Sequence, residues 1–219
     1  MDFRVNDNFD GCCLSLCRAG NRAKSFLDNR RFLVLLLVVH AVLADSGFYL
    51  VKTTAPRFAL GPMPTTVILL VVFYAFAEKD VSDKSLRILT ILSVIRVPVE
   101  IVLLWLYQAG QVPQLMTFEG RNFDILSGLT APVVAWLAFR GGKINRPLLI
   151  VWNLFALGLL LNILINAVLS LETAFQQFAF DQPNRAVLYF PFIWLPAIIV
   201  PIVFVSHILS LWQLLKRSR

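Results

Sequence analysis

Charged residues are scarce in this sequence: Asp, Glu, Lys and Arg make up only 15% of its 219 residues, whereas hydrophobic residues make up 58%. At a mean hydropathy of +0.74, a chain of this kind has too little polar surface to cover a core in water, which excludes a soluble globular protein. Cysteine (three) and glycine (10) are also few, which excludes a disulfide scaffold and a collagen-like repeat. The sequence instead has long apolar stretches, which are typical of membrane spans.

Six apolar windows are long enough to cross the ~30 Å hydrocarbon core of a bilayer, which takes ~20 helical residues. They cover residues 32–51, 58–77, 88–110, 123–139, 147–171 and 186–215. The sixth is longer than a span requires, so we expect its first turns, near 189–194, to lie at the membrane interface. Pro191, Pro196 and Pro201 should kink it. The sequence therefore predicts an all-α, polytopic integral membrane protein, a bundle of six transmembrane helices within residues 32–215.

The distribution of Lys and Arg predicts the orientation of these spans. Fifteen of the 20 lie in the N-terminal tail (1–31), the second and fourth connections and the C-terminal residues 216–219. The opposite side has four, which are Lys52, Arg57, Arg121 and Arg185. Because cytoplasmic loops carry the excess of basic residues, both termini are expected in the cytoplasm. This also explains the net charge of +7 without nucleic acid, and we expect a multi-pass protein of the bacterial cytoplasmic (inner) membrane, with the lipid bilayer as its partner.

The cysteines agree with this topology. Cys12, Cys13 and Cys17 all fall in the tail assigned to the reducing cytoplasm. Their spacing resembles a metal site only weakly, because no His and no fourth Cys lie nearby, so we interpret them as free thiols and predict no metal site. The first span also has features of a signal sequence, including the small residues of Val42-Leu43-Ala44, and we interpret it as an uncleaved helix.

Two charged residues, Arg96 and Glu100, lie inside the third window. A charge at the centre of a bilayer costs about 2.5–3.5 kcal/mol, so each needs a compensating environment. They are four residues apart and share a helix face with Ser93 and Tyr107. Pro98, between the two charges, frees the carbonyl of Val94. This stripe is expected to face the interior of the bundle.

Other spans carry polar residues at a similar depth in the outer half of the membrane, which predicts an outward-facing polar cavity. They are Asn162 and Asn166 in the fifth window, Asp45 in the first and Asp124 at the start of the fourth. In this interpretation Arg96 attracts an anionic group or neutralises Glu100, Glu100 binds a cation or proton, and the asparagines orient the ligand. The alternative is structural: Arg96 and Glu100 only neutralise each other, and the asparagines join neighbouring helices through amide hydrogen bonds.

Two outer connections alternate aromatic and polar residues, and this pattern has two interpretations. It suits rings that sit among lipid head groups, and it also suits a lid over the cavity. The polar members assigned to such a lid are Glu119, Arg121, Asn122, Gln177 and Asp181.

The two histidines suggest an alternative function in electron transfer. His40 and His207 each lie nine residues, or ~13 Å, from the predicted cytoplasmic boundary. A first and a last helix can close a bundle side by side, so the pair could serve as axial ligands of a b-type haem.

No catalytic constellation is evident in the sequence. Ser127 lies near the outer start of the fourth window and His207 deep on the cytoplasmic side, which places them in opposite halves of the bilayer and excludes a serine nucleophile with a histidine base. The sequence is also compatible with a carboxylate-based membrane enzyme that acts on a lipid or small molecule at the outer face. Its base would be Glu100, Glu119 or Asp124.

We therefore expect a non-enzymatic membrane protein that binds or transports a small solute or ion through the cavity. A haem-binding redox protein, a carboxylate enzyme acting at the outer face, and a subunit of a homo-oligomer or larger membrane complex are the alternatives.

Overall fold

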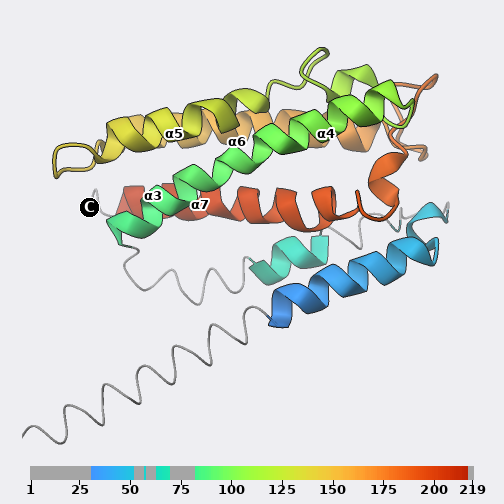
Figure 1. The fold of residues 1–219 in the computed structure, drawn as a ribbon, viewed down its shortest axis with the longest axis horizontal. Coiled ribbons are helices and arrows are strands. Elements are labelled where there is room, and N and C mark those ends of the chain that lie inside the picture. The colour runs from blue at the N-terminus through green and yellow to red at the C-terminus, as the bar shows by residue number, and fades with distance from the viewer. Residues whose placement is uncertain (1–30, 52–56, 58–62, 70–81, 217–219) are drawn as a thin grey trace, which may run out of the picture. The chain divides into compact units, whose positions relative to one another are not determined.

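The computed structural model describes residues 31–51, 57, 63–69 and 82–216. Within them every regular element is helical (Figure 1). The chain divides into two compact units, Met1–Val39 and His40–Arg219. In the first, residues 31–39 are helical. In the second, this helix ends at residue 45, the short 3-10 turn η1 (Phe48–Leu50) follows, and residues 63–69 are again helical.

Several predictions on the N-terminal third lie outside the described residues. These are the tail with Cys12, Cys13 and Cys17, and most of the second window, 58–77. They stay predictions.

The third predicted span is one long helical element, which begins earlier than the sequence predicts. It consists of α3 (Asp83–Leu92), the 3-10 turn η3 (Ser93–Ile95) and α4 (Arg96–Gln108). The Ser82 hydroxyl oxygen accepts from the backbone N–H of Ser85, which caps the start of α3. The tighter turn η3 lies just before Pro98, where the proline cannot donate a hydrogen bond to Val94.

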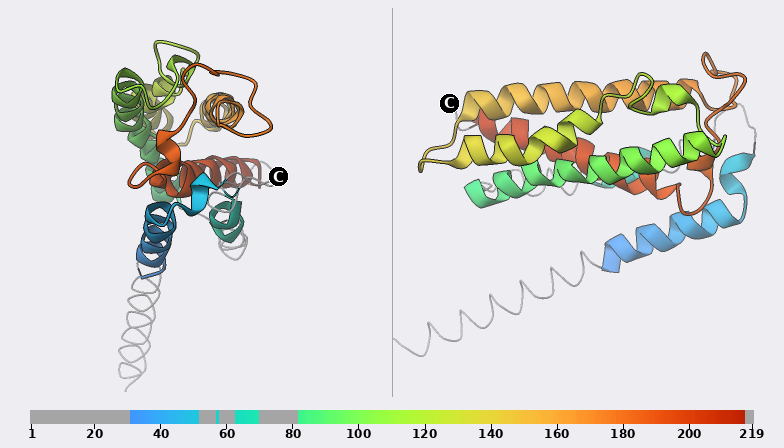
Figure 2. Two further views of the ribbon diagram at one scale, coloured as in Figure 1. Left: turned by 90° about the vertical axis from the view of Figure 1, so that its right-hand side faces the viewer. Right: turned by 45° about the horizontal axis from the view of Figure 1, so that its top comes forward.

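Three further helices pack with this element. They are α5 (Ile125–Phe139), α6 (Arg146–Leu169) and α7 (Val200–Lys216). Neighbouring spans run antiparallel: α5 packs on α3, α4 and α6, and α7 packs on α6 and α3 (Figures 1 and 2). Among the described residues three helices are long and apolar enough to cross a membrane, namely Asp83–Gln108, Arg146–Leu169 and Leu195–Lys216. The helix α5 is apolar but shorter.

The last helix begins later than the sequence predicts. Its first turn is the π-helical segment η6 (Leu195–Ile199), which continues into α7. Residues 186–194 instead form the 3-10 turn η5 (Ala186–Leu188) and turns. Pro191 therefore precedes the helix and cannot kink it, contrary to expectation. The π segment contains Pro196 and ends just before Pro201, whose missing N–H removes the normal helical bond to residue 197.

Small residues allow α5 to pack closely. Gly128, Ala131, Ala135 and Ala138 recur every three or four residues and are all buried. A Cβ at Gly128 would lie 2.7 Å from Cγ2 of Val97, so no larger residue fits there without movement. The opposite face exposes large apolar residues, which are Leu126, Leu129, Val133 and Trp136. This arrangement is typical of a helix with one face on protein and the other on lipid.

The described residues form two larger apolar clusters, besides a small one of Leu171 and Val187. One joins Leu86 of α3, Leu214 of α7 and residues of α5 and α6; the other joins Leu103 of α4, Val203 of α7, Leu160 of α6 and the connection before α5. The buried polar side chains of α4 and α7 fall in sequence between the members of the two clusters.

Candidate functional site

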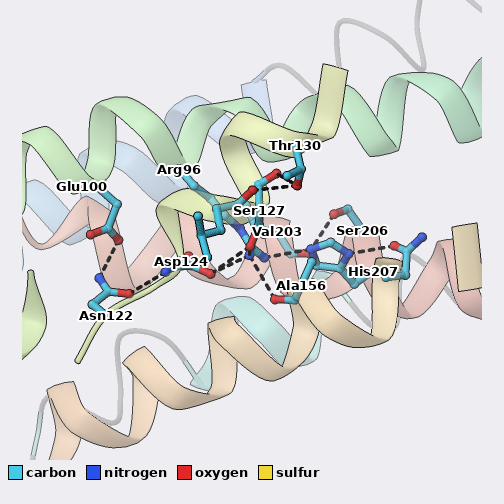
Figure 3. Close-up of polar contacts among 12 residues, drawn as sticks. Arg96, Glu100, Asn122, Asp124, Ser127, Thr130, Ala156, Val203, Ser206 and His207 are labelled. Carbon is cyan, nitrogen blue, oxygen red and sulfur yellow. Dashed lines mark hydrogen bonds and ion pairs between the residues drawn. The ribbon is translucent and has the colours of Figure 1, made fainter. Parts of the chain in front are cut away.

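The guanidinium of Arg96 is the centre of a buried polar network between four helices (Figure 3). Nη1 donates to Oδ1 of Asp124 at 2.6 Å, to Oγ of Ser127 at 2.6 Å and to the carbonyl of Ala156 at 3.0 Å. Nη2 lies 2.8 Å from Nε2 of His207. Arg96 and Asp124 form an ion pair, and both side chains are almost completely buried. We call these five residues, together with Asn153, the Arg96 network.

The network fixes the tautomer of His207. A guanidinium can only donate, so Nε2 of His207 must accept from Arg96. Nδ1 then carries the proton and donates to Oδ1 of Asn153 at 2.8 Å. The amide nitrogen of Asn153 donates onward to the carbonyl of Leu149. The imidazole also lies against Trp152, with 5.7 Å between ring centroids. His207 is therefore a neutral, oriented acceptor.

Glu100 lies beside this network but is bonded to a different residue. Its Oε1 accepts from Nδ2 of Asn122 at 2.5 Å, and the same amide nitrogen donates to the carbonyl of Met116. The other carboxyl oxygen, Oε2, is buried and has no hydrogen-bond partner. Glu100 is thus a fully buried carboxyl with one of its two oxygens unpaired.

The connection before α5 brings Asn122 and Asp124 to these positions. Asp124 directly precedes α5, yet it contacts Arg96, which opens α4 and lies ~18 Å along the helix from Gln108. Residues 109–124 therefore fold back along α4 (Figure 1). This folding back includes a tight turn at Gly120. Only glycine fits there, because a Cβ would lie 2.2 Å from the carbonyl oxygen of Gln114. This folding back explains why the fourth window is short.

Only four of the eight predicted cavity residues are bonded to one another, as the pairs Arg96–Asp124 and Asn162–Asn166. Asn162 donates to the carbonyl of Arg121, the neighbour of Asn122, and Asn166 donates to Asn162. Ser93 is completely buried on the same face as Arg96. Tyr107 is half-buried near the end of α4, and its carbonyl accepts from Gln182. Asp45 is exposed, and no bond joins it to the network.

The predicted lid residues separate into two groups. Glu119, Gln177 and Asp181 are exposed. Arg121 is also exposed, and its guanidinium lies over the ring of Phe178 at 5.7 Å. Asn122, in contrast, is completely buried against Glu100 and belongs to the interior.

Two expectations from the sequence are wrong. Arg96 does not form its ion pair with Glu100; it pairs with Asp124, because the folded-back connection brings that carboxylate to the guanidinium. Ser127 and His207 do not lie in opposite halves, since both contact Arg96. They still form no catalytic dyad: the Ser127 hydroxyl donates to Asp124, and Nε2 of His207 is occupied by Arg96.

On α7, His207 was the only residue predicted to belong to a site, although this helix has a polar face. Ser206, Ser210 and Gln213 are buried on this helix, and their spacing of four and three places them on one face. Asn153 of α6 was also missed. The polar face of α7 and Asn153 could both have been predicted from polar residues at helical spacing in the fifth and sixth windows.

The histidines do not fit an axial haem pair. Nδ1 of His40 lies 2.8 Å from the hydroxyl of Tyr49, and Nε2 lies 3.2 Å from Oγ1 of Thr65. Both ring nitrogens of His207 are likewise engaged by Arg96 and Asn153. Axial ligation needs a nitrogen free to face iron. Among the described residues no group of three His, Cys, Asp or Glu could hold a metal ion.

Fold and site together define an all-helical protein with membrane-length apolar helices around a buried polar layer. Residues 54–215 match the family model described as a domain of unknown function (DUF8737), and because the match covers most of the chain, the protein belongs to this family. No curated protein and no solved structure matches the chain.

Proposed function

We propose that this protein binds a small solute or ion within the membrane and moves it through the polar layer between α4, α5, α6 and α7. The proposal includes six spans, cytoplasmic termini and a location in the bacterial inner membrane. The distribution of Lys and Arg favours the cytoplasmic termini. The observation that carries it is Glu100, a buried carboxyl on a membrane-length helix whose Oε2 has no partner.

The charges around Glu100 favour a functional role over a structural one. Arg96 is balanced by Asp124, and His207 is held neutral by its two hydrogen bonds. No further cation balances Glu100 in the network. Ionisable groups inside membrane spans are costly and commonly mark ion and substrate pathways. A purely structural layer would be expected to satisfy both carboxyl oxygens.

The folded-back connection supplies a second supporting argument. Non-helical backbone at membrane depth is tolerated only where it is buried in protein or lines a polar cavity. The end of the connection before α5 fits this condition, because Asn122 and Asp124 are buried in protein; the connection also carries Asn122 to Glu100 and the Arg121 carbonyl to Asn162. In the proposed function Glu100 binds the cationic part of the ligand or a coupling ion, and Asn162 and Asn166 orient a polar ligand arriving from outside.

Purified protein in detergent provides the test. A panel of amino acids, sugars, organic acids and inorganic salts is screened for ligands that raise the melting temperature, because a ligand bound only to the folded state stabilises it. We expect at least one compound to raise Tm in the wild type and in the exposed-loop control Glu119→Gln, and to lose this effect in Glu100→Gln. The same compound should enter vesicles containing wild-type protein.

The proposal fails if no compound in the panel changes Tm, or if Glu100→Gln responds and transports as the wild type does. Glu100→Gln preserves an oxygen that can accept from Asn122, so its loss of response would not reflect misfolding.

A further inference from the structure

Three unpaired polar atoms occupy one face of the α3–α4 element. They are Oγ of Ser93, Nε of Arg96 and Oε2 of Glu100, each buried and without a hydrogen-bond partner. The residues are spaced by three and four positions, so they follow one another along the helix. The face therefore presents a hydroxyl, an N–H donor and a carboxyl oxygen. Buried polar atoms are normally paired, and three adjacent exceptions require an explanation.

The chemistry of these atoms restricts what they can bind. A Ca²⁺ or Mg²⁺ ion takes six or more oxygen ligands, whereas this face offers only a hydroxyl and one carboxyl oxygen, next to a guanidinium that repels a cation. An anion would face the carboxyl of Glu100. A proton needs only one basic oxygen, and the unpaired Oε2 of Glu100 provides it.

We propose that Glu100 is an exchangeable proton site, with the proton carried on the unpaired oxygen Oε2. This deepens and rests on the proposed function, because it names the coupling ion as a proton. In the loading step a hydronium ion transfers its proton: an O–H bond of hydronium breaks, an O–H bond forms on Oε2, and neutral water leaves. The charge of Glu100 changes from −1 to zero, and no other bond changes.

The surrounding groups are compatible with this step. The charged groups that act on Glu100 are Arg96 on its own helix and Asp124 at the start of α5. His207 of α7 lies beyond, on the guanidinium of Arg96. Because the Arg96–Asp124 pair is direct and buried, it stays ionised in both states of Glu100. The bond from Asn122 to Oε1 also persists, because a carbonyl oxygen of a neutral acid still accepts from an amide.

Infrared difference spectroscopy on the full-length protein in lipid vesicles tests the site directly, because a neutral carboxylic acid has a carbonyl stretch that a carboxylate lacks. Taking the wild type from acidic to alkaline buffer should remove one buried carboxylic acid band reversibly. Glu100→Gln should lack this band, and the exposed-loop control Glu119→Gln should retain it.

Two results would overturn the proton site: a wild-type spectrum without a titrating buried acid band, or a band that persists unchanged in Glu100→Gln. Failure of the proton site is distinguishable from failure of the proposed function. A solute that stabilises the wild type but not Glu100→Gln, without a titrating acid band, would retain solute binding and exclude the proton. A titrating acid band without any stabilising solute would retain the proton site and exclude solute binding.

Discussion

Nε2 of His207 lies 2.8 Å from Nη2 of Arg96, although 111 residues separate the two along the chain. This contact joins the last helix to the first half of the bundle, and it gives His207 one defined role. Because arginine cannot accept a hydrogen bond, the histidine must be neutral on that nitrogen. Any positive charge on His207 would face the guanidinium directly and lose the bond.

The tautomer of His207 is therefore the first prediction. In protein labelled with ¹⁵N-histidine, the Nδ1 of His207 should show the chemical shift of a protonated nitrogen and Nε2 that of an unprotonated one. The assignment comes from comparison with His207→Gln, since His40 is the other histidine in the chain. A signal from a doubly protonated ring at neutral pH would contradict the network.

The second prediction concerns the ion pair. Asp124→Asn should lower the melting temperature strongly, because it leaves Arg96 as a buried cation without its carboxylate. Removing one partner of a buried pair costs about 3–5 kcal/mol in soluble proteins. Glu100→Gln should be much milder, since the glutamine oxygen still accepts from Asn122 and no cation is left unpaired.

Thermal unfolding in detergent measures this difference, and Glu119→Gln, in the exposed part of the connection before α5, is the control with no change expected. Equal destabilisation by Asp124→Asn and Glu100→Gln would mean that Arg96 is balanced by both carboxylates, contrary to the geometry.

Hydropathy is a local property, so the sequence was sufficient for some boundaries of the described helices. The start of α6 at Arg146 and the end of α5 at Phe139 lie within one residue of the predicted windows. The buried stripe of Ser93, Arg96 and Glu100 also followed from helical spacing alone.

The partners of these residues could not be predicted in the same way. Helical spacing places Glu100 next to Arg96, but it contains no information on a connection that folds back to deliver Asp124 and Asn122. Depth was estimated by counting residues from the ends of each window. That count fails for Ser127, because its helix begins inside the bundle, where Ser127 contacts Arg96.

The third prediction tests the close packing of α5. Gly128→Ala should destabilise the protein by about 1–3 kcal/mol, as expected for overpacking. The added Cβ would lie 2.7 Å from Cγ2 of Val97 and 3.2 Å from the carbonyl oxygen of Ser93. Gly158→Ala in α6 is the matched control: its Cβ would meet nothing within 4 Å, so the better helix propensity of alanine should leave stability unchanged or raise it by about 0.5–1 kcal/mol. If both variants melt together, α5 does not pack as closely as the structure shows.

The last prediction concerns orientation, for which the two ends of α5 provide a matched pair of probes. Glu119 lies in the connection before α5 and Lys143 in the one after it, and both are exposed. Each is changed to cysteine in a background in which Cys12, Cys13 and Cys17 are serine. Because the connection around Lys143 is rich in basic residues and the other is not, Lys143 should face the cytoplasm. A membrane-impermeant thiol reagent should therefore label Glu119→Cys in intact cells and Lys143→Cys only after the membrane is opened. The opposite pattern would invert the orientation and place the folded-back connection, with Asn122 and Asp124, on the cytoplasmic side. Labelling of both in intact cells would show that α5 does not cross the membrane.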